Sequence, residues 1–258
     1  MANTVYPNKI IEAKAKDLLL TAVNARSLMT IDTSLTQAAG MTKVVNTYTY
    51  SGEAEELDVG EGNTNRGSIT YVPKEYTVKL VQQAFDYYDE DYYKDPGIVD
   101  MMLKAANQVM VNKMFSDFAA ACATATLEHT LTAALVYDEI VDGIATLNLE
   151  DESSLFVIIP NAWKADLRKD PDYKAAQMGQ VIYNGQVGEV CGLPVIGSKP
   201  LTESYVMTNE AIKLYLKADV EVEQDRDPDT RKNSVYLRTS YLVALEDATK
   251  ICKLKKGA

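Results

Sequence analysis

The fold of this chain is indicated most clearly by the stretch Gly185-Gln-Val-Gly-Glu-Val-Cys-Gly-Leu-Pro-Val-Ile-Gly-Ser198. It predicts two short strands joined by a Gly-Leu-Pro turn, because Gly192 frees the backbone at the corner and Pro194 is tolerated only at a strand start or edge. Shortly after it, Asp219-Val-Glu-Val-Glu-Gln-Asp-Arg-Asp227 alternates apolar and acidic residues. This period of two is typical of a half-exposed strand.

The composition is that of a soluble globular protein with a sizeable core. The 258 residues are 47% hydrophobic and 24% charged, enough for one large domain or two small ones. Sixteen tyrosines against four phenylalanines and one tryptophan are less usual. Tyrosine suits a surface that is wet before assembly and buried after it, and it equally suits a solvent-facing sheet.

The charge is acidic and unevenly distributed. A net charge of −11 argues against nucleic-acid binding by the whole surface, which would need lysine and arginine. Residues 1–50 carry five basic and three acidic side chains, residues 51–100 carry four and twelve, and residues 250–258 carry four lysines and no acid. Opposite charges in different regions fit a protein that meets copies of itself, although a solvated surface would show the same pattern.

The cysteine pattern and the absence of an apolar run indicate the cellular compartment and argue against a disulfide-bonded or metal-binding protein. The three cysteines are odd in number and widely spaced, which favours a reducing cytoplasm and predicts neither a disulfide framework nor a metal motif. We expect neither a signal peptide nor a membrane span.

The N-terminal half predicts a helix, a long hairpin and a second, longer helix. Asn8 to about Met29 has helical spacing. Strands alternate on both sides of the polar, glycine-containing segment Ser51–Gly67, which is too long for a tight turn and predicts a projecting β-hairpin. The acidic and aromatic cluster Asp86–Asp95 is expected to be a solvated or inter-subunit face. Asp95-Pro96 then begins a helix to about Ala125, roughly 40 Å long.

The C-terminal half reads as alternating helices and strands. We expect His129 to lie at a helix end and residues 173–184 to form a loop. The remaining expected elements are helices over 137–147 and 161–169 and strands over 155–159, 205–207, 211–216, 235–245 and 250–254.

The sequence contains no motif that predicts a catalytic residue, a cofactor or a metal site. His129 is the only histidine, so a Ser-His-Asp triad or Cys-His pair would depend on it, and a structural role is favoured. One histidine and three scattered cysteines give no zinc motif. The glycines of the 185–192 segment have the wrong spacing for a dinucleotide, and Thr230 stands where a calcium loop starting at Asp225 needs glycine. Carboxylates that converge in space remain an open alternative.

The order of these elements resembles the major capsid protein of tailed bacteriophages, the Hong Kong 97-type capsid fold. The resemblance rests on Gly192-Leu-Pro-Val-Ile196 with Ser198 beyond it, Val220-Glu-Val-Glu-Gln-Asp-Arg226, Tyr50-Ser-Gly-Glu-Ala-Glu55 with Gly60-Glu-Gly62, and Pro160-Asn161. It implies an α+β fold divided into an N-terminal arm (1–41), an extended β-hairpin loop (42–82), a peripheral domain (83–126 and 215–258, with a spine helix over 96–125) and an axial α/β domain (127–214).

The resemblance also implies a function. The chain would self-assemble as hexamers and pentamers into an icosahedral shell that encloses double-stranded DNA without sequence-specific binding. It would be part of the virion, assembled in the bacterial host cytoplasm with separate scaffold, portal and head-completion proteins. Glu53, Glu55, Glu56 and Arg66 of the extended loop would contact neighbouring subunits. No lysine lies between Lys43 and Lys74, so we expect no covalent cross-link through this loop.

Two other interpretations remain open at this point. An encapsulin-type nanocompartment shell would share the fold and load a cargo enzyme instead of a genome. A cytosolic α+β enzyme or ligand-binding domain would be a monomer or small oligomer with a pocket, and it gives no account of the long polar hairpin.

Overall fold

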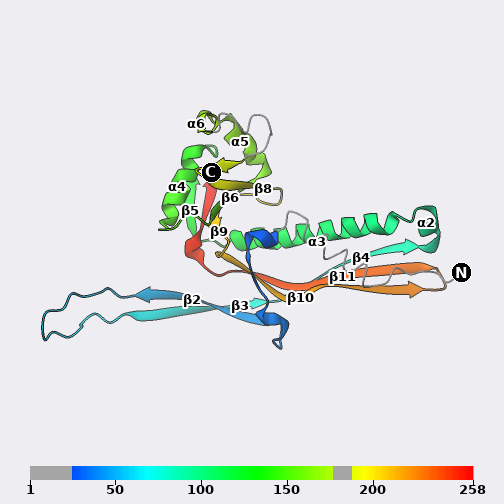
Figure 1. The fold of residues 1–258 in the computed structure, drawn as a ribbon, viewed down its shortest axis with the longest axis horizontal. Coiled ribbons are helices and arrows are strands. Elements are labelled where there is room, and N and C mark those ends of the chain that lie inside the picture. The colour runs from blue at the N-terminus through cyan, green and yellow to red at the C-terminus, as the bar shows by residue number, and fades with distance from the viewer. Residues whose placement is uncertain (1–24, 177–187, 258) are drawn as a thin grey trace.

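The computed structural model describes residues 25–176 and 188–257. Figure 1 shows an elongated molecule in which a long helix and a long sheet run side by side, a compact group of strands and helices sits at one end of them, and a hairpin projects away from both. Most of the helix expected from Asn8 to Met29 lies outside the described residues. Its described end, Ala25–Leu28, is a 3₁₀-helix.

The elongated body consists of a four-stranded sheet and the helix α3. The sheet has the order β1-β10-β11-β4 and comprises β1 (Thr30–Asp32), β10 (Ile212–Asp227), β11 (Lys232–Leu245) and β4 (Lys79–Tyr88). β10 and β11 form a long antiparallel pair, and β4 adds to β11 in antiparallel register from Lys79↔Tyr241 to Tyr88↔Lys232. The helix α3 (Ile98–Cys122) follows the short helix α2 (Asp89–Lys94) and packs on this sheet. Val220 and Val222 of β10, two residues apart and so on the same face of the sheet, pack against the first half of the helix.

The compact body is a six-stranded sheet with helices around it. Its order is β5-β12-β9-β6-β8-β7, with β5 (Leu127–Leu131), β12 (Ile251–Lys256), β9 (Ser204–Thr208), β6 (Leu155–Pro160), β8 (Leu193–Ser198) and β7 (Glu189–Val190). The helix α4 (Tyr137–Leu147) lies on it closely: a Cβ built on Gly143 would stand 2.6 Å from Leu254 Cδ2. The helices α5 (Lys164–Lys169) and α6 (Pro171–Ala176) follow β6.

The two bodies share one core. Phe118, near the C-terminal end of α3, is fully buried in a cluster that holds Ile158 and Tyr205 from the six-stranded sheet together with Leu214 and Tyr241 from the four-stranded sheet. A separate cluster fills the compact body beneath α4, and another lies between the first half of α3 and strands β10 and β11. The C-terminal half of the long helix therefore joins the two sheets.

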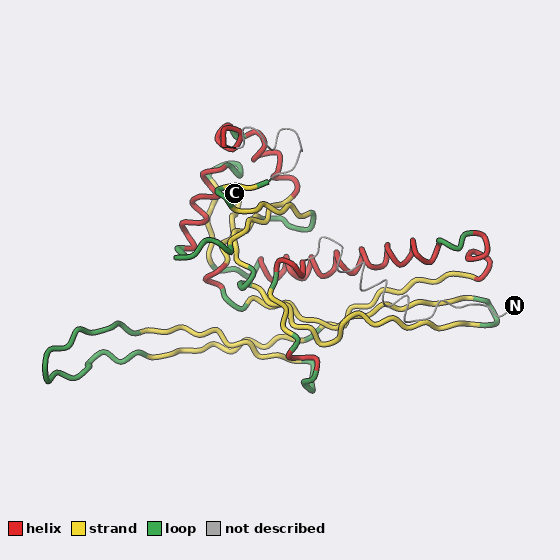
Figure 2. The backbone as a smooth tube through the Cα atoms, viewed as in Figure 1, coloured by secondary structure: helices red, strands yellow, loops and turns green. Residues whose placement is uncertain are grey.

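The projecting element is the antiparallel hairpin of β2 (Thr42–Ser51) and β3 (Ser68–Thr77). Among the described residues these strands pair only with each other, so the hairpin forms a two-stranded sheet of its own. Figure 2 shows it extending from the body, with its far end built from irregular chain. The prediction of a long hairpin around Ser51–Gly67 is confirmed.

The described part of the Gly185–Ser198 stretch, residues 188–198, contains two short antiparallel strands, β7 and β8. Cys191 and Gly192 occupy the turn with positive φ values of 55° and 77°, a conformation that glycine adopts without steric cost. Leu193 and Pro194 begin β8 instead of forming the turn. Pro194 therefore lies near a strand start, as its missing amide requires.

Three local expectations were wrong. His129 lies in strand β5, not at a helix end, because the helix before it stops at Cys122. The start of the predicted loop 173–184 belongs to helix α6, and residues 177–187 lie outside the described structure. The long helix begins at Ile98, where Asp95 Oδ1 accepts the amide of Gly97 at 2.9 Å just before it.

The last strand lies in an unexpected place. We assigned residues 215–258 to the peripheral domain together with the long helix. Strand β12 instead pairs with β5 and β9 inside the six-stranded sheet. Its buried side chains Ile251, Cys252 and Leu254 complete the core under α4 and the junction of the two bodies.

Candidate assembly surface

The hairpin exposes an apolar face that the rest of the described chain does not cover. Tyr48 pairs directly with Tyr71, and Tyr50 pairs with Ile69, so these four side chains share one face of the two-stranded sheet. Tyr48 is 68% and Tyr71 61% exposed, and their ring centroids lie 6.5 Å apart. A contiguous exposed patch of large apolar side chains marks an interaction surface in a soluble protein.

The tip of the hairpin is ordered by one carboxylate. Glu55 accepts hydrogen bonds from the backbone N–H groups of Thr64 and Asn65, at 2.7 and 3.0 Å, and from the Thr64 hydroxyl at 2.5 Å. These hydrogen bonds, first of all the one from the Thr64 hydroxyl, lower the pKa of Glu55. These hydrogen bonds therefore join the two irregular arms of the tip within the single chain.

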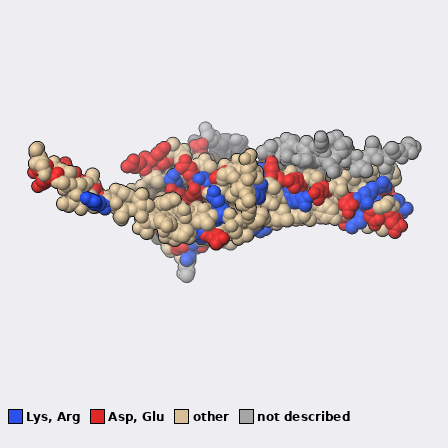
Figure 3. Space-filling model, turned by 90° about the horizontal axis from the view of Figure 1, so that it is seen from below, with Lys and Arg blue, Asp and Glu red and all other residues tan. Residues whose placement is uncertain are grey.

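The structure brings all four predicted contact residues to this tip but divides their roles. Glu53, Glu56 and Arg66 are exposed, whereas Glu55 turns inward to hold the loop. Figure 3 shows acidic and basic side chains gathered at the tip, separated from the charges of the body by an uncharged stretch of hairpin. That these four residues contact neighbouring subunits stays a prediction.

The root of the hairpin is fixed to the long helix by a buried acid. Asp117 of α3 binds Lys113 Nζ at 2.8 Å and Lys79 Nζ at 3.3 Å, and its other oxygen accepts the Tyr241 hydroxyl at 2.9 Å. Burial raises the pKa of Asp117, but these partners outweigh it and leave the pKa below its ordinary value. Lys79 is the first residue of β4, so this network sets where the hairpin leaves the body.

The far end of the elongated body carries a second group of charges, arranged as ion pairs. Arg226 Nη2 lies 2.7 Å from Asp89, Arg231 Nε lies 2.6 Å from Glu90, and Lys232 Nζ lies 2.7 Å from Asp86. These pairs join the turn between β10 and β11 to α2 and the end of β4. They are partly exposed, so each contributes only ~0–1 kcal/mol to the fold.

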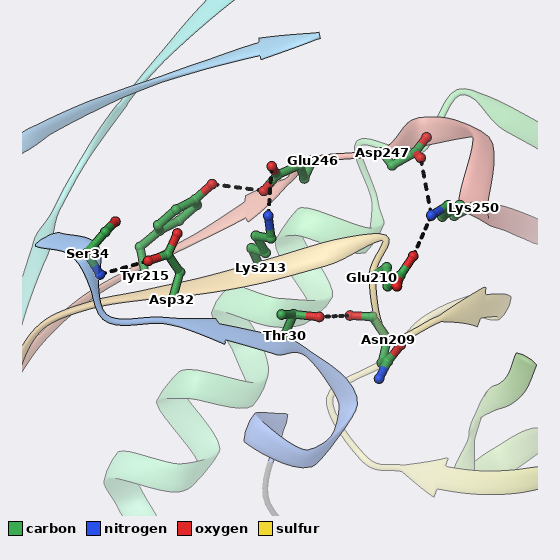
Figure 4. Close-up of polar contacts among 10 residues, drawn as sticks. All are labelled: Thr30, Asp32, Ser34, Asn209, Glu210, Lys213, Tyr215, Glu246, Asp247 and Lys250. Carbon is green, nitrogen blue, oxygen red and sulfur yellow. Dashed lines mark hydrogen bonds and ion pairs between the residues drawn. The ribbon is translucent and has the colours of Figure 1, made fainter. Parts of the chain in front are cut away.

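Polar contacts also surround the junction of the two bodies (Figure 4). Glu246, just after β11, accepts Lys213 Nζ at 2.9 Å and the Tyr215 hydroxyl at 2.8 Å, while Lys250 binds Glu210 and Asp247. Nearby, the Thr30 hydroxyl donates to the carbonyl of Asn209 at 3.0 Å. Together with the shared core, these contacts tie the compact body to the start of β10 and the end of β11.

The chemistry available in the described chain is limited. His129, Glu139 and Asp142 form the one group of three or more potential metal ligands found among the described residues. Cys122 and Cys252 are buried, and burial raises the pKa of the Cys252 thiol to about 11, so at neutral pH it is not a thiolate. No described helix is long and apolar enough to span a membrane.

Comparison with known proteins gives one sequence relative and many structural ones. No family model matches the chain. It is 26% identical over 242 residues to the "Major capsid protein" of Staphylococcus phage phiMR11, and the match covers 90% of this chain and 86% of the relative.

The solved structures agree with that relative. The capsid of the cyanophage P-SCSP1u superimposes with a TM-score of 0.66 at 13% identity, covering 89% of this chain and 86% of the other. The virus-like particle of Pyrococcus furiosus gives a TM-score of 0.64 at 10% identity, covering 97% and 100%. The chain is a phage-type capsid shell protein. The resemblance seen in the sequence and the α+β capsid fold are thereby confirmed.

The functional surface of this capsid protein was only partly visible in its sequence. The acidic tip was recognisable from glycines and charges, but the tyrosine face was not assigned to the hairpin. Its signal was present, because Tyr48, Tyr50, Ile69 and Tyr71 alternate with threonines on both sides of the loop. The Asp117 network had no signal, since it joins residues 38 and 124 positions apart.

Proposed function

We propose that this capsid protein builds an icosahedral shell of hexamers and pentamers around double-stranded DNA, as the head of a tailed phage. Its role in that shell is structural and needs no catalysis. Assembly takes place in the bacterial host cytoplasm with separate scaffold, portal and head-completion proteins, and the product is the virion. The division into an arm, an extended loop and peripheral and axial domains belongs to the same proposal, with residues 251–256 moved to the axial domain.

The projecting hairpin carries this proposal. An isolated two-stranded hairpin is marginal in water, and this one also exposes four large apolar side chains on one face. Such an element gains its stabilising contacts from another molecule. In a shell of identical subunits the natural partner is the neighbouring copy, so the hairpin is the extended loop that reaches across a subunit boundary.

The charges support contact between copies without a DNA-specific surface. The tip exposes three charged side chains, those of Glu53, Glu56 and Arg66. In the shell they form ion pairs with opposite charges of a neighbouring subunit. A single exposed pair contributes only ~0–1 kcal/mol, but it recurs at every subunit contact. With a net charge of −11, the chain has no general attraction for phosphate, which favours packaging without sequence recognition.

The test is assembly with and without the hairpin tip. Light scattering after size-exclusion chromatography, with negative-stain microscopy, should show megadalton shells or discrete capsomers for the full chain. A variant in which an Asn-Gly turn replaces Gly52 to Arg66 should keep its circular dichroism and thermal unfolding but form no closed shell. An exposed-loop variant in the compact body, Glu150→Gln, serves as the control and should assemble normally. Normal shells from the shortened hairpin would refute the assignment of the extended loop.

The contents of the particles separate this function from the nanocompartment alternative. Particles from infected or lysogenic cells should protect double-stranded DNA from nuclease, whereas an encapsulin-type shell would contain a protein cargo. The sequence relative is a phage protein, which favours the first result. A monomer that never assembles, even with crowding agents and candidate scaffold proteins, would favour the enzyme or ligand-binding alternative.

A further inference from the structure

The compact body brings together three metal-binding side chains that lie apart in the sequence. His129 belongs to β5, whereas Glu139 and Asp142 lie on the first turns of α4. One ligand atom from each lies within 4.8 Å of the others, and His129 Nε2 is 2.7 Å from Glu139 Oε2. The spacing matches no sequence motif, so this group could be found only in the folded chain.

The central carboxylate is held in a fixed orientation. Glu139 Oε1 accepts the backbone N–H of Thr132 at 2.8 Å and the Thr132 hydroxyl at 2.5 Å. The second oxygen, Oε2, is thereby directed at the imidazole. A carboxylate ligand whose other oxygen is fixed by neighbouring donors is the usual arrangement around bound metals.

The charge of the group is incompletely balanced. Glu139 is buried, and Asp142 beside it is exposed. No lysine or arginine within residues 25–176 and 188–257 forms an ion pair with either carboxylate. The N-terminal end of α4 contributes only a partial positive charge, which falls off within one turn. Two carboxylates with one imidazole therefore favour a divalent cation between them.

We propose that His129, Glu139 and Asp142 bind a divalent transition-metal ion of the zinc class. Imidazole suits zinc and disfavours magnesium and calcium, which prefer oxygen ligands alone. Zinc would replace the hydrogen that His129 Nε2 donates to Glu139 Oε2, which leaves as a proton to solvent, and would draw in the exposed Asp142. In a tetrahedral site the ligand atoms stand roughly 3.3 Å apart, so the present 2.7 Å contact opens only slightly. A water molecule completes the coordination, and the ion fastens α4 to β5.

The test is zinc binding to the purified, chelator-treated chain, measured by calorimetry at pH 7.5. We expect one zinc site per chain, unaffected by excess magnesium, that is lost in His129→Gln. Glutamine can still donate a hydrogen bond to Glu139, so this variant keeps the local structure while removing the nitrogen ligand. Asp142→Asn should weaken binding at least tenfold. Thr132→Val should weaken it about tenfold by releasing the oriented carboxylate.

Two controls exclude other sites. Cys191 is the one partly exposed cysteine of the chain, and Cys191→Ser should leave the zinc isotherm unchanged. Asp138→Asn removes a neighbouring carboxylate of the same helix turn and should also have no effect. An unchanged isotherm in His129→Gln, or loss of binding in Cys191→Ser, would overturn the proposal. All three ligands belong to one chain, so the result does not depend on whether shells form.

Discussion

The β2–β3 hairpin and the long helix α3 are both extended elements, but they have opposite character. Along α3, buried side chains meet both sheets, and Phe118 is completely enclosed. Along the hairpin, large apolar side chains face solvent, and within residues 25–176 and 188–257 no third strand pairs with β2 or β3. The helix is packed within one chain, whereas the hairpin exposes an apolar face that we propose a neighbouring copy covers. Stability and assembly should therefore respond to different residues.

The largest effect on the isolated chain should come from the shared core. Phe118→Ala would leave a cavity between the two sheets, and we expect a loss of about 3–5 kcal/mol in the free energy of unfolding. Urea unfolding followed by circular dichroism measures it. The exposed Met101→Ala on the same helix is the matched control and should change little. Equal losses in the two variants would contradict the description of the core.

The second largest loss in the free energy of unfolding should come from the hydrogen bonds of Asp117 at the root of the hairpin. Asp117→Ala removes the acceptor of the buried Tyr241 hydroxyl, and an unsatisfied buried donor costs about 1–3 kcal/mol. Tyr241→Phe should cost less, because Asp117 keeps its two lysines. If the double variant lost the sum of the two single losses, the two groups would not interact.

Acid should weaken the compact body through Glu139. Burial raises its pKa, but the hydrogen bonds from Thr132 and His129 leave the pKa below the ordinary value of 4.5. A carboxyl with a lowered pKa in the folded state stabilises the fold above its unfolded pKa, and this contribution is lost as the pH falls below 4.5 through the folded value. Glu139→Gln should cost ~1 kcal/mol at pH 7 and show a flatter pH profile. An unchanged slope between pH 5 and 3 would refute this role.

Substitutions on the exposed face of the hairpin should have the smallest effect on stability, and they test most directly whether the hairpin serves assembly and not folding. Tyr48→Ser with Tyr71→Ser should change the free energy of unfolding by less than about 0.5 kcal/mol, because both rings are exposed in the single chain. The same variant should fail to form shells in light scattering. The exposed Tyr93→Ser on α2 is the control. Normal shells from the double variant would mean that the face has no partner.

The sequence predicted the elements with strong local signals. The helix over 137–147 and the strand over 155–159 lie where their periodicity placed them, and the alternating segment 219–227 is part of β10. The family resemblance supplied the arrangement that periodicity lacks. Local patterns could not reveal that Lys250–Leu254 pairs with the distant strands β5 and β9, because sheet membership is decided by contacts far apart in the chain. They also could not show that Glu55 accepts hydrogen bonds from the opposite arm of the loop.

The position of β12 has a consequence for how the protein is made. This strand lies between β5 and β9, so the compact sheet is split until residues 251–256 are in place. During synthesis the residues before β12 emerge from the ribosome first, and the six-stranded sheet stays incomplete until β12 follows. The core under α4 closes only when synthesis has passed Leu254.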